Sequence, residues 1–219
     1  MSRVLIALIV IALWPSVALT QAAVGNEAGE QVRKALEIRG EAGRGEAAFE
    51  PCQGCHRKDA SGRTSGAYPR LSGQHATVLV KQISDFQSGR RSNPKMEPFI
   101  GDHVLNSFEI ADIAIYLQGL PVSPANGKGP GSGVTRGYQL YGKDCVECHG
   151  TRGEGNAEKL HPMVAAQHYR YLLRQAQLIR DGDRRNSNPD MVKVIKPYTN
   201  SDLEAVADYM SRLEPPDKK

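Results

Sequence analysis

Two short segments hold the residues best suited to chemistry, and both have the pattern Cys-x-x-Cys-His. They are Cys52-Gln-Gly-Cys55-His56 and Cys145-Val-Glu-Cys148-His149. Two thiols three positions apart are about one helical turn from each other, so each can bond to one vinyl group of a haem. The adjacent histidine then lies under the ring, where a ring nitrogen can bind iron. The pattern predicts two covalently bound haem c groups, with His56 and His149 as iron ligands.

Three other roles compete for these four cysteines. A redox-active Cys-x-x-Cys pair does not require a histidine after the second cysteine, yet both segments have one. A shared zinc site would favour cysteine pairs closer together than these, which are 93 residues apart. Structural disulfides are also open to an exported chain. The repeated histidine favours haem over all three.

The two segments belong to an internal repeat. Adding 93 to a position in the first half finds its counterpart in the second; examples are Cys52 and Cys145, Pro69 and Pro162, His75 and His168, and Tyr116 and Tyr209. The offset becomes 95 where Asn93-Pro94-Lys95-Met96 matches Asn188-Pro189-Asp190-Met191. Such self-similarity predicts a duplicated unit.

The unrepeated stretches give the expected boundaries. Residues 121–133 are rich in Gly and Pro and have no periodicity, which is typical of a linker. We therefore expect one haem-binding domain over 44–120 and a second over 134–219. Residues 23–43 have no counterpart and form an N-terminal extension, either with a short helix over 30–39 or mobile.

Apolar residues recur with helical spacing, and neither half alternates like a strand. Helices are expected over 72–88 and 167–180, each followed closely by a glycine. A last helix in each half should begin at a capping box, formed by Asn106 with Glu109 and by Ser201 with Glu204. The predicted fold class is all-α, with each haem supplying volume to a small core.

Each iron needs a second axial ligand. Met96 and Met191 occur once per copy, at equivalent positions, on a loop where Asn-Pro imposes an extended approach, so we expect them to bind iron. His75 and His168 are the rivals, although their place at a helix start favours a polar contact there. Met210 is expected in the core, and His103 and His161, which have no counterparts, on the surface.

Residues around the haem histidines suggest supporting contacts. Pro69 and Pro162 each follow a haem histidine by 13 residues, and their carbonyls can accept the second imidazole N–H, which would orient the ring. The alternative role for both prolines is a turn. Arg70 can pair with a haem propionate, whereas its counterpart is Met163.

Residues 1–22 have the pattern of an export signal. Arg3 precedes an apolar run over 4–13, and small residues offer cleavage after Ala18 or Ala22. An uncleaved membrane anchor is the weaker alternative, because the run is shorter than the about 20 residues needed to span a bilayer. The mature protein is expected in the periplasm, with peripheral membrane association remaining open.

The distribution of charged residues argues against nucleic-acid binding and decides little else about function. Residues 23–120 hold 12 basic and 12 acidic residues, whereas 121–219 hold 15 and 12. This small excess, without a basic run, does not indicate nucleic-acid binding. We expect a mixed, solvated surface, with docking to an acidic partner as the weaker alternative.

The order Cys-x-x-Cys-His, Tyr68-Pro-Arg-Leu-Ser-Gly-Gln-His75 and Asn93-Pro-x-Met96, repeated with variation, resembles the dihaem cytochrome c4 family. The resemblance covers about residues 44–213. It implies two tandem class I cytochrome c domains facing each other, His/Met irons, and electron transfer to terminal oxidases or other periplasmic acceptors. The second copy departs from the pattern at His161-Pro-Met-Val-Ala-Ala166, which affects the expected surroundings of the second haem.

Function follows from the expected coordination. If thioether bonds use all four thiols and His and Met fill both axial sides, no iron position is open to a substrate, which favours a single-electron carrier over an enzyme. Two alternatives remain open: a dihaem enzyme similar to thiosulfate dehydrogenase, and the haem subunit of a flavocytochrome c sulfide dehydrogenase. No Gly-x-Gly-x-x-Gly fingerprint occurs here, so any flavin would belong to a partner.

Overall fold

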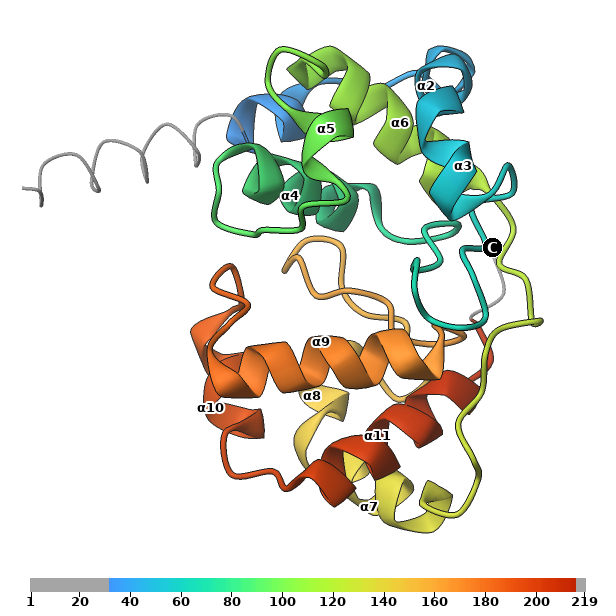
Figure 1. The fold of residues 1–219 in the computed structure, drawn as a ribbon, viewed down its shortest axis with the longest axis vertical. Coiled ribbons are helices and arrows are strands. Elements are labelled where there is room, and N and C mark those ends of the chain that lie inside the picture. Colours follow the sequence, from blue (N-terminus) through green and yellow to red (C-terminus); the bar gives the residue numbers. More distant parts are fainter. Residues whose placement is uncertain (1–31, 216–219) are drawn as a thin grey trace, which may run out of the picture.

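The computed structural model describes residues 32–215, which form helices and loops without a β-strand (Figure 1). The all-α prediction is confirmed. After a helical segment over 32–37, the first half contains α2 (Ala42–Ala48), the 3-10 helix η1 (Glu50–Cys52), α3 (Gln53–His56), α4 (Ala76–Gln87), α5 (Glu97–Ile100) and α6 (Ser107–Gly119). The second half contains α7 (Val134–Asp144), α8 (Val146–His149), α9 (Tyr169–Asp181), α10 (Pro189–Ile195) and α11 (Asn200–Arg212).

Two predictions fall partly or wholly outside this range. The export signal over 1–22 lies outside the described residues, as does the beginning of the extension. A helix is present over 32–37, so the predicted helix over 30–39 is confirmed there but ends two residues earlier than expected; Ala35 is buried in the first core. Among residues 32–215, no helix is both long and apolar enough to cross a bilayer.

In each half, the helix that precedes the Cys-x-x-Cys-His segment crosses the last helix at a glycine. A Cβ on Gly45 of α2 would collide with the carbonyl oxygen of Asp112 in α6, and one on Gly137 of α7 would collide with that of Ala205 in α11. Such close backbone approach requires a residue without a side chain. Asp112 and Ala205 are 93 residues apart, but the two glycines are 92 apart. The repeat therefore gains one residue just before the second Cys-x-x-Cys-His segment.

This shifted register aligns the aromatic residues that fill the two crossings. Phe49 lies 5.9 Å from Tyr116 between ring centroids, and Tyr141 lies 5.3 Å from Tyr209. Phe49 and Tyr141 are each only 1% exposed. The predicted apolar faces of α6 and α11 pack against them; the buried members are Ile110, Ile113, Ala114 and Leu117 in the first core and Leu203, Val206, Ala207 and Met210 in the second. Met210 is thus a core residue, as predicted.

The two domains face each other through α4, α9 and the loops that follow the haem histidines (Figure 1). A pair of glutamines makes reciprocal hydrogen bonds across this interface. Gln74 accepts from the Met163 N–H at 2.9 Å and donates to the Met163 carbonyl at 3.0 Å. Gln167 does the same with Arg70, at 2.9 Å in both directions. Because these residues are repeat counterparts, the interface has an approximate twofold symmetry.

A second symmetric set joins the facing helices. Arg91 donates to Gln82 of its own domain at 2.6 Å and to Gln175 of the other at 2.9 Å. Arg184 donates to Gln175 and to Gln82, both at 3.0 Å. Burial lowers the pKa of Arg184 to about 10, so this guanidinium remains charged at neutral pH. These hydrogen bonds satisfy the guanidinium donors in a partly buried interface.

One predicted helix start is wrong. Asn106 caps α6 in a capping box with Glu109, as predicted, but α11 begins after Thr199, which forms its capping box with Asp202. Ser201 lies inside the first turn of α11. Thr199-x-x-Asp202 and Ser201-x-x-Glu204 both satisfy the capping pattern. The earlier pair forms the cap because Tyr198, directly before it, is buried in the second core.

This assignment predicts different costs for two neighbouring alanine substitutions. Thr199→Ala should lower the free energy of unfolding of the haem-loaded protein by about 1 kcal/mol, because the Asp202 N–H loses its acceptor. Ser201→Ala, at an exposed first-turn position, should change it by less than about 0.5 kcal/mol. Urea titration followed by circular dichroism measures both. A larger loss of stability in Ser201→Ala than in Thr199→Ala would show that Ser201 is the N-cap residue.

Candidate functional site

His56 is the last residue of α3, and only one of its two ring nitrogens has a hydrogen-bond partner. Its Nδ1–H donates to the Pro69 carbonyl at 3.0 Å; a carbonyl can only accept, so the proton must be on Nδ1. Nε2 therefore has the lone pair, and it is buried without a hydrogen-bond partner. A buried polar atom left unsatisfied is costly unless something else binds it. This is the arrangement that an iron-binding imidazole requires.

His149 lies at the end of α8 and makes the same Nδ1 contact. Its Nδ1–H donates to the Pro162 carbonyl, also at 3.0 Å. Burial lowers the pKa of both histidines, and nearby His161 adds to the effect at His149, so both rings are neutral at neutral pH. A neutral imidazole is the form that binds metal. The hydrogen bonds expected from both prolines are present.

The four thiols lie on the turns that lead to these histidines. Cys52 is the N-cap residue of α3, and Cys55 lies inside this helix. Cys145 and Cys148 occupy the same two positions in α8. All four are free. Burial raises the pKa of Cys52 to about 11 and that of Cys145 to about 12. Two free thiols beside an imidazole with an available Nε2 fit a haem attached through its vinyl groups, so the residues of both halves fit the predicted cofactor.

The two predicted methionine ligands occupy different local structures. Met96 is the N-cap residue of α5, half-buried, and packs against the same core as Cys52. Met191 is the third residue of α10, so the expected loop position is wrong for it. Asn188 is extended as predicted, with ψ 132°, but Pro189 then starts the helix. Proline restricts the residue before it and is well tolerated at the first helical position, so Asn-Pro allowed both outcomes.

His75 and His168, the rival ligands, bind across the domain interface instead. The His75 Nε2–H donates to the Glu154 carbonyl at 2.8 Å, and the His168 Nε2–H donates to that of Ser61 at the same distance. Both histidines are N-cap residues, of α4 and α9, in agreement with the expected polar contact at a helix start. Nε2 therefore carries a proton in both rings, and in His168 the other ring nitrogen accepts from the Gly127 N–H at 3.1 Å.

The Arg70 side chain makes hydrogen bonds to the other domain. Its side chain, 2% exposed, donates to the carbonyls of Ala165 at 2.8 Å, Ala166 at 3.2 Å and its own neighbour Ser72. Burial lowers its pKa to about 10, which leaves it charged at neutral pH. Carbonyl oxygens are its acceptors here, so its predicted pairing with a propionate stays a prediction.

The sequence patterns missed a ring that lies beside each haem histidine. Tyr68 packs edge-on to His56 with 6.2 Å between ring centroids. His161 takes its place in the second domain and hydrogen-bonds through Nδ1 to the Cys148 carbonyl at 3.1 Å. His161 is half-buried, so its predicted surface position is wrong, whereas His103 is exposed as predicted. The 93-residue register pairs Tyr68 with His161 and is the signal that could have placed both.

The protonation of His168 gives a test that separates the interface from ligation. Burial lowers its pKa below 6.5, so the folded protein binds this proton less readily than the unfolded chain. Its contribution to stability is therefore present above pH 6.5 and is lost as the pH falls from 6.5 toward the folded-state pKa. His168→Leu should lower the free energy of unfolding at pH 7 by about 1–3 kcal/mol and flatten its decline with acid.

The visible spectrum of the same variant is the control. His168→Leu should leave the bands of both haems unchanged at pH 7, because the side chain binds Ser61 and Gly127. Loss of an axial-ligand band in this variant would make His168 an iron ligand.

Comparisons with known proteins agree with this geometry. The family profile "Cytochrome c" matches residues 134–214. The chain is 31% identical to the thiosulfate dehydrogenase electron acceptor of Stutzerimonas stutzeri, covering 74% of this chain and 78% of that protein. It is 32% identical to cytochrome c4 of Stutzerimonas stutzeri, covering 79% and 88%. The crystal structure of reduced cytochrome c4 from Pseudomonas stutzeri superposes with a TM-score of 0.73 at 27% identity, covering 80% of this chain and all of that one.

Each of these relatives matches about three quarters or more of the chain, which is more than either half of the repeat alone. The similarity in sequence and in fold accounts for the duplicated helical domains, the free thiols and the prepared imidazoles together. The chain belongs to the cytochrome c4 family of dihaem electron carriers and binds haem c covalently.

Proposed function

We propose that this protein carries single electrons in the periplasm, with His56 and Met96 binding one iron and His149 and Met191 binding the other. Bound haem supplies an iron that gains and loses one electron. The chain's own residues hold the imidazoles by the Pro69 and Pro162 carbonyls and keep them neutral by burial. The buried, partnerless Nε2 of His56 is the observation on which the proposal rests.

A closed coordination shell favours a carrier over an enzyme. If a thioether sulfur fills the remaining axial position of each iron, neither iron can bind a substrate, and electrons must pass through the haem edge. We therefore propose that the chain is not itself an enzyme. Binding of carbon monoxide to the reduced protein would identify an open iron and support a dihaem enzyme similar to thiosulfate dehydrogenase.

The location and acceptor are proposed from the sequence. The pattern of residues 1–22 supports export and cleavage, and the cytochrome c4 resemblance supports a terminal oxidase or another periplasmic protein as acceptor. Peripheral association with a membrane is compatible with such an acceptor.

One relative supports a more specific donor. The thiosulfate dehydrogenase electron acceptor of Stutzerimonas stutzeri is 31% identical over 172 residues, and this chain covers 78% of it. We propose a thiosulfate-oxidising enzyme as a candidate donor. A flavoprotein is the competing donor if the chain is the haem subunit of a sulfide dehydrogenase, and co-purification of a flavoprotein would favour that alternative.

The methionine assignments predict a spectral change in single variants. The oxidised protein should show an iron–thioether charge-transfer band in the near infrared. Met96→Ala and Met191→Ala should each remove half of this band and lower the potential of the affected haem, because a thioether favours the reduced iron.

Met210→Leu is the matched control. Met210 is buried in the second core, and a swap of similar volume should leave the whole band in place. A full band in Met96→Ala or in Met191→Ala would remove that ligand assignment.

A further inference from the structure

Five large hydrophobic side chains are exposed among residues 32–215, and three of them lie between residues 99 and 108 of the first domain. Phe99 of α5, Val104 of the following loop and Phe108 of α6 are 44%, 41% and 65% exposed. A single exposed apolar side chain is ordinary, but a cluster of them often marks an interaction site. The other two are Leu36 and Tyr138.

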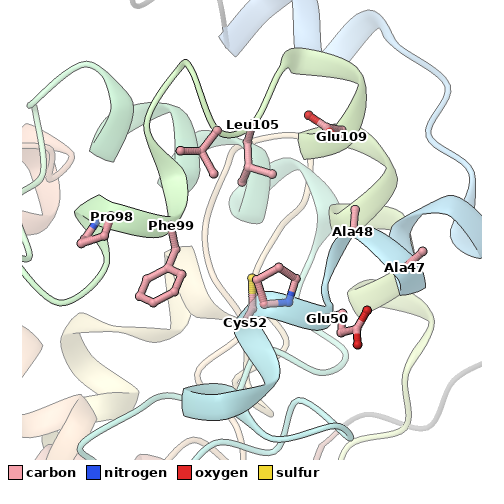
Figure 2. A pocket seen from close by; sticks show the side chains of 10 residues that line it. Ala47, Ala48, Glu50, Cys52, Pro98, Phe99, Leu105 and Glu109 are labelled. Carbon is pink, nitrogen blue, oxygen red and sulfur yellow. The ribbon is translucent and has the colours of Figure 1, made fainter.

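Phe99 and Val104 line a cavity of about 280 Å³ that reaches Cys52 (Figure 2). In Figure 2, Phe99 and Leu105 approach this space from one side, and Cys52 and Ala48 approach it from the other. Cys52 is a thiol to which the first haem is attached. A protein that covers the cavity mouth would therefore lie close to Cys52, one of the two thiols that would hold the first haem, and so close to the group that exchanges the electron.

The charge around this cavity has one sign. Glu50 and Glu109 line it, and the remaining lining side chains are apolar. The two segments that supply the lining, 45–52 and 97–109, contain five carboxylates, from Glu46, Glu50, Glu97, Asp102 and Glu109, and no Lys or Arg. All but Glu109 are exposed. We call residues 45–52 and 97–109 the acidic–apolar surface.

The second domain differs at the equivalent positions. Counted back from the first cysteine of each haem segment, Glu50 corresponds to Lys143. Around α5 the offset is 95, because this aligns the buried Ile100 with the buried Ile195. Phe99 then corresponds to Val194, and Pro98 corresponds to Lys193. In the last helix the offset is 93, so Phe108 corresponds to Ser201. The equivalent segments, 137–145 and 192–202, contain three lysines and two aspartates. The second-domain segments thus have a small excess of positive charge, whereas the first-domain segments contain five carboxylates and no Lys or Arg.

We infer that the acidic–apolar surface is the docking site for a redox protein that presents an apolar contact ringed by Lys or Arg. Protein interfaces commonly have an apolar, aromatic-rich centre within a polar rim, which Phe99 and Phe108 among the five carboxylates provide. Carboxylates of one sign attract a basic partner and reject an acidic one. The second domain would repel this partner through its lysines, so the partner reaches the first haem selectively. This inference rests on the proposed electron-carrier function.

Direct binding tests this inference. The haem-loaded protein and a basic monohaem cytochrome c with a lysine-ringed haem edge are both kept reduced, so that no net electron transfer occurs, and titrated by calorimetry at low salt. Glu50→Lys and Phe99→Val, which copy the second domain, should each raise the Kd about tenfold. Glu50→Lys should also weaken the salt dependence of binding, whereas Phe99→Val should leave it unchanged, because only the first removes a charge interaction.

Matched controls lie on the second domain. Lys143→Glu and Lys193→Glu should change the Kd by less than twofold, and an acidic ferredoxin used as a probe should not compete with the basic cytochrome. Equal Kd values for the wild type and both first-domain variants would overturn the inference, as would weak binding of the basic probe to the wild type or a tenfold effect from the second-domain lysines. Unchanged visible spectra in these variants would leave the proposed electron-carrier function standing when the docking inference fails.

Discussion

The hydrogen bond from each haem histidine to a proline carbonyl 13 residues later is the constraint on which both sites depend. Because a carbonyl can only accept, it fixes the proton on Nδ1 and leaves the Nε2 lone pair available for iron. Burial acts in the same direction by keeping the ring neutral. The polypeptide thus prepares the imidazole that we propose binds iron, and the proline carbonyl that holds it lies 3.0 Å away in both domains.

Duplication of this unit creates a second constraint, the interface between the copies. Counterpart residues make counterpart bonds there: Gln74 and Gln167 bind backbone groups, and His75 and His168 bind carbonyls of the loops that follow the opposite haem histidines. These loops also carry Pro69 and Pro162, so the interface supports the residues that orient the imidazoles. The copies have diverged at positions that leave this network intact. Tyr68 is replaced by His161, and the surfaces around Cys52 and Cys145 differ in charge. A symmetric frame therefore holds two unequal haem surroundings.

Local sequence patterns were sufficient to predict the cofactor, the four main helices and the contacts of the haem histidines. The Cys-x-x-Cys-His segments gave the cofactor, periodicity gave α4, α6, α9 and α11, and the 13-residue spacing gave the proline contacts. Predictions failed where two local solutions were equally good, as for the Thr199 and Ser201 caps, or where Asn-Pro allows both a turn and a helix start, as for Met191. Helices α2 and α7 have glycines where periodicity expects apolar residues, and only the crossing with α6 or α11 explains them. The partners of Arg70, His75 and His168 come from the other domain, so no local pattern could indicate them.

The central claim is that each iron is bound by one imidazole and one thioether sulfur. The proton NMR spectrum of the fully reduced protein tests it most directly, because a methionine bound to a diamagnetic haem iron has its methyl protons directly over the ring current. The account predicts two separate three-proton signals shifted far upfield, one for Met96 and one for Met191. A spectrum with one such signal, or with none, would contradict it.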